Sequence, residues 1–241
     1  MDGVPWDVVA LIGAVTCVGA FVQSVVGLGL GLLVAPVVAM VEPGLVPALP
    51  LWLALMISGS MLLGERRHVD WGALAWALPA RVPGTVVGAW LVVTFSDQAI
   101  AVAIGVMVLV AVFVTLGTVH VPVNPASLTV AGVVAGVSGT ATSIGGPPIA
   151  LLFQRREPEV VRSTLSVFFF LGVVVSLVGL AWSGSLTEAS WHLGLLLAPL
   201  VAVGAYAGSA ARDRVPRHGF RIGVLLVCAA SALALLVQAL V

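Results

Sequence analysis

The sequence contains no lysine, a single tyrosine and two cysteines, and only 8% of its 241 residues are charged. Soluble globular domains have about 25% charged and about 45–50% apolar residues. Here 61% of the residues are hydrophobic, and the mean hydropathy is +1.20. One soluble core could not bury so much apolar surface, so the composition excludes soluble enzymes, nucleic-acid binders and disordered chains. It indicates a polytopic membrane protein.

Further absences narrow the interpretation. The net charge is zero, so bulk charge indicates no partner. Cys17 and Cys228 both lie in apolar stretches, and we expect them to pack as small hydrophobic residues rather than to form a disulfide. No basic residue precedes the first apolar segment, so we expect that segment to be retained rather than cleaved as a signal peptide.

Six apolar stretches have the length of about 20 residues that a helix needs to cross a membrane. Two further apolar runs, 8–41 and 126–153, are longer, and glycine-rich sequences interrupt them at Gly27–Gly31 and Gly139–Pro148. An unbroken helix of that length would extend beyond the bilayer, so we expect a broken or hairpin element in each run. The six expected spans are approximately 45–63, 71–94, 99–118, 163–182, 190–211 and 220–240.

The arginines indicate the orientation in the membrane, because short cytoplasmic loops collect arginine. They gather at 66–67, 155–162 and 212–221, whereas the loops near Glu42 and Asp97 carry none. If the arginine-bearing loops are cytoplasmic, the run 126–153 begins and ends on the same side. It must then pass the membrane an even number of times, as a re-entrant hairpin or as a pair of helices.

An internal repeat appears when the sequence is shifted by 116 residues. The shift aligns the two glycine-rich runs and puts the arginine-bearing loops out of phase, so the halves would have opposite orientations. Inverted repeats with paired broken helices are typical of secondary transporters, whose substrate site lies near the membrane midplane. We therefore predict an all-α polytopic membrane protein with inverted repeats at 1–120 and 121–241, each with one broken element and three full transmembrane helices. The aligned pairs are Gly29 with Gly145, Ser60 with Ser176, Pro83 with Pro199, Gly88 with Gly204 and Asp97 with Asp213.

The two breaks form the first candidate site. Glycine lets a ligand approach the main chain closely, and a helix broken at membrane depth frees N–H groups that favour an anion. Close helix packing through small residues is the alternative, and Ser and Thr often bond carbonyls of their own helix. The residues that we expect to contact an anion here are Gln23, Ser24, Gly27, Gly29, Gly31, Thr142, Ser143, Gly145, Gly146 and Pro147.

Arg81 is the second candidate. It lies about ten residues into the span that begins at Trp71, which places it about 15 Å deep by the helical rise. A charge near the midplane costs at least about 2.5 kcal/mol and is a functional hypothesis by default. We expect Arg81 to face an anion. The alternatives are that it snorkels, or that it caps carbonyls freed by Pro79 and Pro83.

Other absences bear on mechanism. No Asp or Glu is expected in the middle of a span, so the usual carboxylate proton relay is not visible, and no phosphate-binding loop indicates ATP as an energy source. We expect no cofactor, no metal and no nucleic acid. The expected partners are a small anionic substrate and the lipid bilayer. Whether the protein forms a homodimer stays open, because helix faces of small residues serve contacts within or between protomers equally well.

An intramembrane protease is a less favoured alternative. Gly136-Val137-Ser138-Gly139 matches the Gly-x-Ser-Gly motif of rhomboid proteases, and His192 follows in a later span. A serine and an imidazole could form a nucleophile and base. However, His192 is expected at the membrane interface and Ser138 deep inside. We therefore expect no catalytic residue.

Four stretches together resemble one known family: Phe21–Pro36, Pro47–Asp70, Pro83-Gly84 with Gly88, and Gly139–Pro148. In these stretches the chain is similar to the sulfite exporter TauE/SafE family, also called the four-toluene sulfonate uptake permease family. One departure is that the first motif is Gly-x-Gly-x-Gly rather than a tight glycine cluster. The resemblance implies transport of sulfite, sulfoacetate, sulfonates or similar anions across the bacterial inner membrane.

The sequence thus predicts a secondary transporter of a small sulfur-containing or organic anion, working by alternating access in the inner membrane with its arginine-rich loops cytoplasmic. Arg81 and the two breaks independently favour an anion, but they do not select sulfur. An anion-selective channel that uses the same breaks is the main alternative.

Overall fold

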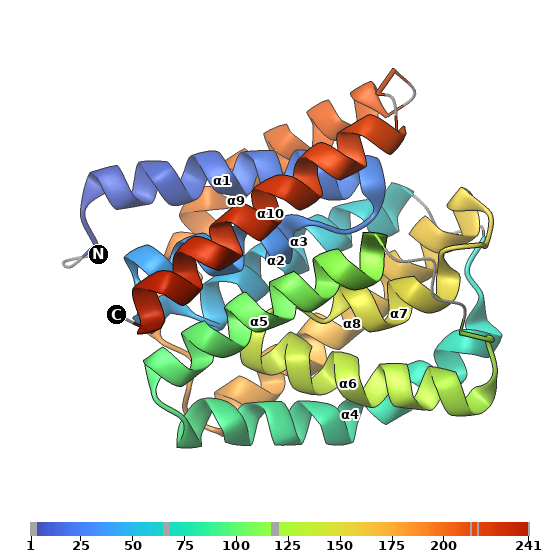
Figure 1. The fold of residues 1–241 in the computed structure, drawn as a ribbon, viewed down its shortest axis with the longest axis horizontal. Helices are drawn as coiled ribbons and strands as arrows, with labels where there is room; N and C mark the ends of the chain where they lie inside the picture. The colour runs from blue at the N-terminus through green and yellow to red at the C-terminus, as the bar shows by residue number, and fades with distance from the viewer. Residues whose placement is uncertain (1–3, 65–67, 117–120, 213, 216, 241) are drawn as a thin grey trace.

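The computed structural model describes residues 4–64, 68–116, 121–212, 214, 215 and 217–240. Arg66, Arg67, Asp213 and the expected repeat boundary at residue 120 lie outside these residues. The described chain forms ten α-helices and one short 3-10 helix (Figure 1). The elements are α1 (Trp6–Val26), α2 (Leu30–Val41), η1 (Pro43–Leu45), α3 (Ala48–Gly64), α4 (Trp71–Thr94), α5 (Asp97–Leu116), α6 (Pro125–Thr142), α7 (Gly146–Phe153), α8 (Pro158–Trp182), α9 (Glu188–Ala211) and α10 (Arg217–Leu240).

Six helices in the described part of the chain are long and apolar enough to cross a membrane: α1, α4, α5, α8, α9 and α10. Five of them match expected spans. The sixth expected span, 45–63, is α3, whose 17 residues are at the short end of the range of about 17–25 for a spanning helix. The sixth helix that is long enough to cross the membrane is instead α1, which forms the first part of the run 8–41. The chain is therefore a multi-pass membrane protein.

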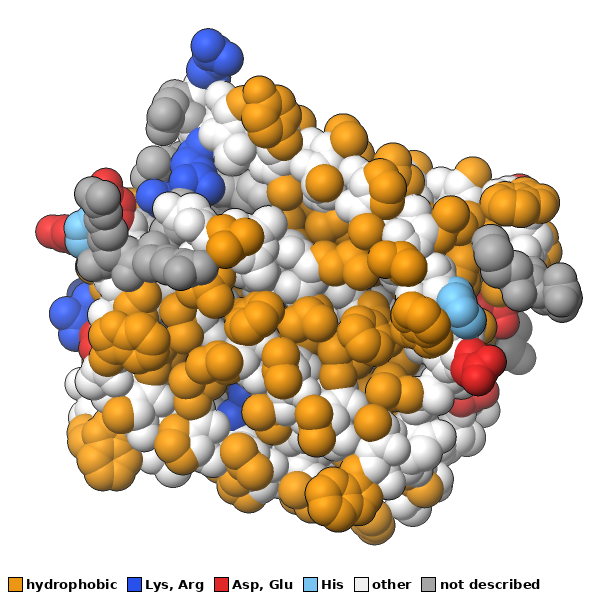
Figure 2. Space-filling view, turned by 180° about the vertical axis from the view of Figure 1, so that it is seen from behind, with side chains coloured by type: hydrophobic (Ala, Val, Ile, Leu, Met, Phe, Trp, Pro, Cys, Tyr) orange, Lys and Arg blue, Asp and Glu red, His pale blue; other side chains and the backbone are white. Residues whose placement is uncertain are grey.

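The surface agrees with this arrangement. Figure 2 shows hydrophobic side chains over the middle of one face and charged side chains mostly at its two ends. Several large apolar side chains are strongly exposed, including Trp182, Tyr206 and Phe113. Such a surface suits hydrocarbon rather than water. Cys17 and Cys228 are both free thiols, as expected, and Cys228 is buried.

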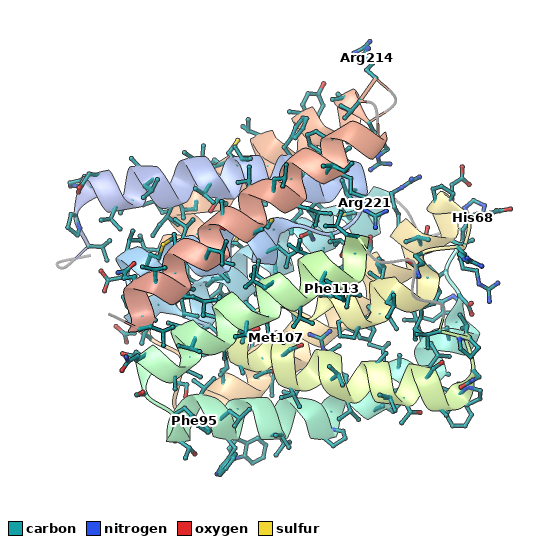
Figure 3. The ribbon with its side chains drawn as sticks, in the orientation of Figure 1. His68, Phe95, Met107, Phe113, Arg214 and Arg221 are labelled. Atoms are coloured by element: carbon teal, nitrogen blue, oxygen red, sulfur yellow. The ribbon has the colours of Figure 1, made fainter. Side chains whose placement is uncertain are left out.

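Arginines gather at one end of the bundle, which we call the arginine end. Figure 1 shows α1, α3, α5, α7 and α9 running toward it, and α2, α4, α6, α8 and α10 running away from it. Figure 3 shows Arg214 and Arg221 at this end, together with His68, and Phe95 at the other. The acidic residues Asp97 and Glu188 begin helices at the opposite end.

Both long apolar runs are broken, as the glycines predicted. α1 ends at Val26 and is capped by Gly27, whose φ of 95° is in the left-handed region that favours glycine. The N–H of Gly27 donates to the Gln23 carbonyl at 2.7 Å. Gly29, with φ 149°, then precedes α2. In the second run, Ser143 ends α6 at φ 62° and Gly145 precedes α7. Each run is thus one long helix joined to a short one, 12 residues in α2 and eight in α7.

Glycines allow the long helices to pack backbone against backbone. On α6, a Cβ at Gly132 would overlap the carbonyl oxygen of Ala77 on α4, and a Cβ at Gly136 would overlap that of Arg81. At the interface of α1 and α9, a Cβ at Gly204 would overlap the Cys17 carbonyl oxygen in the same way. Small residues of this kind let membrane helices approach closely. The α4–α6 contact fixes the part of α4 that carries Arg81.

We expect Gly132→Ala to destabilise the fold by about 1–3 kcal/mol, because the added methyl overlaps the Ala77 oxygen and lies 3.0 Å from Ala80 Cβ. Gly223→Ala on α10 is the matched control, since a Cβ there meets nothing within 4 Å. The control should keep or raise stability, because alanine is the better helix former by about 1 kcal/mol. Thermal unfolding of both purified variants measures the difference. Equal stability would contradict the close α4–α6 packing.

Candidate functional site

A small cavity of about 50 Å³ lies where the two breaks meet. This volume accommodates several water-sized groups. It is lined from the first break by Gln23, Leu28, Gly29, Gly31 and Leu32, and from the second by Gly139, Ser143, Ile144, Gly145, Gly146 and Pro147. Arg81 of α4, Leu51 and Ala54 of α3, and Phe169 and Val173 of α8 complete the lining. Among these described lining residues none is Asp or Glu.

The two breaks touch each other directly. A Cβ at Gly31 would lie 2.6 Å from the carbonyl oxygen of Ser143. A Cβ at Gly146 would lie 3.1 Å from the ring of Phe169 and 4.0 Å from Leu28 Cβ. Only glycine fits at Gly31 without displacing the second break. The two glycine-rich motifs therefore line the same small cavity.

Arg81 is almost fully buried, with 2% of its surface exposed. Its guanidinium packs on the backbone of Gly172, and its Cζ lies 4.9 Å from the ring centroid of Phe168, a cation–π geometry. A Cβ at Gly139 would lie 3.0 Å from Nη2, and one at Gly145 3.4 Å from it. Helices α4, α6 and α8 therefore hold the charge beside the second break, and Arg81 does not snorkel.

Two of the three guanidinium nitrogens lack hydrogen-bond partners in the described part of the chain. Nε and Nη1 of Arg81 are buried and have no hydrogen-bond partner among the described residues. The contact between His68 Nδ1 and Glu159 Oε2, at 3.5 Å, lies elsewhere and does not involve Arg81. A buried charge without a partner is costly, since it has lost its hydration. An anion in the adjoining cavity would compensate this charge.

Helix starts add positive potential to the cavity. The first turns of α2 and α7 both begin at its wall, and the N–H groups of a first turn have no acceptor within their own helix. In α2 the N–H of Leu30 donates to Gln23 Oε1 at 3.1 Å, and the next two residues of this first turn, Gly31 and Leu32, both line the cavity. α7 offers fewer donors, because Pro147 and Pro148 have no N–H.

Two predicted polar ligands also hold the site together. The amide oxygen of Gln23 accepts the Leu30 N–H and so joins the end of α1 to the start of α2. The hydroxyl of Ser143 donates to the Pro47 carbonyl at 2.8 Å and joins the second break to the start of α3. Each side chain can make further hydrogen bonds: the Gln23 NH₂ can donate, and the lone pairs of the Ser143 oxygen can accept.

Eight of the eleven predicted site residues line this cavity, and three do not. Ser24 faces α9, because a Cβ at Gly208 of α9 would lie 2.8 Å from Ser24 Cβ. The Ser24 carbonyl also accepts a hydrogen bond from Arg212 at the end of α9. The Thr142 hydroxyl donates to the Ser138 carbonyl at 2.7 Å within its own helix. Gly27 lies beside the side chain of Arg162. The eight are Gln23, Gly29, Gly31, Arg81, Ser143, Gly145, Gly146 and Pro147.

The sequence interpretation missed the contribution of α8. Gly172, Phe168, Phe169 and Val173 surround the guanidinium or line the cavity, yet they lie in an ordinary apolar span without a motif. Their role follows only from α8 packing against α4.

A buried hydroxyl cluster lies one helical turn beyond Arg81. Thr140 on α6 bonds Ser176 on α8 at 2.8 Å and Thr85 on α4 at 3.3 Å. The three side chains are at most 2% exposed. Interhelical hydrogen bonds of this kind stabilise membrane bundles, so the cluster fixes α4, α6 and α8 around the guanidinium.

The proposed protease pair is not joined in the described chain. The Ser138 hydroxyl donates to the Val134 carbonyl at 2.9 Å, within α6. The ring of His192 packs on Trp191, with centroids 4.3 Å apart, near the start of α9. No hydrogen bond links the two side chains among the described residues, so the geometry offers no nucleophile–base contact.

Comparison with known proteins identifies the family of this chain. The family model described as sulfite exporter TauE/SafE matches residues 11–235. A curated protein of Cupriavidus necator, named "Probable sulfite/organosulfonate exporter TauE", is 28% identical over 236 residues, covering 89% of this chain and 90% of that protein. No solved structure matches the chain. The family match extends over both breaks and Arg81, and the chain therefore belongs to the sulfite exporter TauE/SafE family of membrane transporters.

Proposed function

We propose that this transporter exports a small sulfur-containing anion, sulfite or an organic sulfonate, and binds it in the cavity between the two helix breaks. The observation that carries the proposal is Arg81 at the wall of that cavity, a buried guanidinium whose Nε and Nη1 have no hydrogen-bond partner among the residues that the structure describes. The family and the name of the C. necator relative support sulfur oxyanions as the substrate class.

In this proposal the anion replaces the lost hydration of Arg81. The guanidinium supplies the full charge, while the N–H groups near Gly31 and Gly145 hydrogen-bond the anion oxygens. The helix starts of α2 and α7 add partial positive charges on two sides. The Gln23 NH₂ adds a further donor, whereas the Ser143 hydroxyl donates to the Pro47 carbonyl and so helps to position the second break rather than donating to the anion. Because such donors match any small oxyanion, selection among oxyanions rests on the fit to the cavity.

Transport by alternating access is the mechanism that we propose, with residues 1–120 and 121–241 as inverted repeats. Support comes from the elements: adding 116 to the bounds of α2, Leu30–Val41, gives 146–157, beside α7 at Gly146–Phe153. Equivalent helices run in opposite directions, as α1 and α6 do (Figure 1). The packing of α4 on α6 is likewise matched by that of α9 on α1. Rocking of one repeat against the other would open the cavity to each side in turn.

We further propose that the protein lies in the inner membrane with the arginine end in the cytoplasm, following the bias of short cytoplasmic loops toward arginine. An anion leaving a cell that is negative inside gains about 2.3 kcal/mol per charge per 100 mV. Export therefore needs no coupling ion, in keeping with a cavity wall in which no described residue is a carboxylate.

Flux measurements in proteoliposomes test the proposal. We expect saturable, counterflow-competent transport of sulfite or of an organic sulfonate such as sulfoacetate, measured beside sulfate and lactate. Empty liposomes and liposomes that contain an unrelated membrane protein are the controls. A flux that neither saturates nor shows counterflow would indicate the anion channel instead. If none of these anions moves, the proposed function is wrong.

A further inference from the structure

A second and larger cavity, of about 260 Å³, opens beside the first at the arginine end of the bundle. It is enclosed by the end of α1, the end of α5, α7, and the first turns of α8 and α10. Its walls are mainly apolar, formed by residues such as Val25, Leu151, Leu165 and Val224. The cavity is about five times the volume of the first one.

Three arginines line this cavity: Arg156, Arg162 and Arg221. They come from the α7–α8 loop and from the first turns of α8 and α10. Arg221 donates to the Thr115 carbonyl at the end of α5, and Figure 3 shows it at the arginine end, whereas Arg214 projects further out. Among the described residues that line the cavity none is Asp or Glu. The space thus combines an apolar wall with several positive charges.

Only a thin partition separates the two cavities. Leu28, Gly29, Leu32 and Pro147 line both of them, and all four belong to the two breaks. A ligand in the larger cavity would lie against the far side of the elements that surround Arg81. Motion at the breaks would then connect the two spaces.

We infer that the larger cavity is a docking site for organic anions that carry a short apolar chain, alkanesulfonates above all, before they reach Arg81. The arginines bind the sulfonate group and the apolar walls bind the chain. Bare sulfite needs only the smaller cavity, so the larger one extends the substrate range toward organic sulfonates. This inference rests on the proposed function, since it describes the approach to the same site.

Two measurable properties follow. Alkanesulfonates should inhibit sulfite transport more strongly as the chain grows from methane- to butanesulfonate. The inhibition constant should fall by about fourfold for each methylene that becomes buried. Arg156→Gln and Arg221→Gln should each raise the apparent KM for propanesulfonate by about fivefold and leave kcat unchanged, because both arginines are exposed and water screens their charge-assisted bonds to the sulfonate. Arg214→Gln, at the same end but outside the cavity lining, should leave both values as in the wild type.

The test is performed in vesicles of phosphatidylcholine alone and of phosphatidylcholine with phosphatidylglycerol. If propanesulfonate is the occupant, the arginine variants raise KM in both compositions. If the arginines instead hold an anionic lipid headgroup, the variants differ from the wild type only with phosphatidylglycerol, and inhibition is independent of chain length. That result, or variants that match Arg214→Gln in both vesicles, overturns the inference. A wild type that moves no anion overturns the proposed function itself.

Discussion

Arg81→Gln is expected to lower sulfite or sulfonate transport by about a hundredfold or more, because the variant loses charge-assisted hydrogen bonds of about 1.5–3 kcal/mol each. The same change should not destabilise the protein. Nε and Nη1 have no partner in the described chain, so removing the charge removes a desolvation penalty without breaking a hydrogen bond of theirs. Flux in proteoliposomes and thermal unfolding of the detergent-solubilised protein measure the two effects.

Ligand-induced stabilisation separates a binding role from a structural one. Saturating sulfite should raise the unfolding temperature of the wild type, as expected for a ligand that binds only the folded state, and should leave that of Arg81→Gln unchanged. Arg81→Lys keeps the charge but not the planar donor fork, so it should recover only part of the flux. Arg214→Gln, which removes an exposed charge, is the control. Full transport by Arg81→Gln, or a clear loss of stability, would make Arg81 structural.

Gly172→Ala is expected to reduce transport nearly as strongly, although residue 172 carries no functional group. A Cβ at this position overlaps Cζ, Nη1 and Nε of Arg81, so the guanidinium must shift from its present place beside the second break. Overpacking in a buried site also costs about 1–3 kcal/mol of stability. Initial rates of sulfite flux and thermal unfolding of the variant measure the change.

A double variant makes the Gly172 prediction specific. In Gly172→Ala combined with Arg81→Gln, the shorter side chain leaves room for the methyl group, so the stability should return toward that of Arg81→Gln while transport stays low. Such non-additivity is expected for residues in contact. Gly59→Ala at the α3–α8 interface is the control, because a Cβ there would be in ordinary contact at 3.4 Å with Phe170. Additive losses of stability would contradict the packing of the guanidinium on Gly172.

The sequence alone determined the membrane class and the position of the breaks. Hydropathy and length identify membrane spans because a bilayer demands about 20 apolar residues for each crossing. Glycine and proline at Gly27–Gly31 and Gly139–Pro148 interrupt a helix for local backbone reasons that need no tertiary contact. The depth of Arg81 follows from counting along α4, and so the anion hypothesis was also within reach of the sequence.

Tertiary structure decided which of these residues share a site. Ser24 and Thr142 lie in the same short segments as Gln23 and Ser143, but the helix rotation directs Ser24 toward α9 and the Thr142 hydroxyl to its own helix. The tertiary structure also decided the role of Gly172. Because α8 packs against α4, the backbone of Gly172 contacts the guanidinium of Arg81. In a chain so rich in small apolar residues, many rotations fit the sequence pattern equally well. The face that each helix presents is chosen only by the helices packed around it.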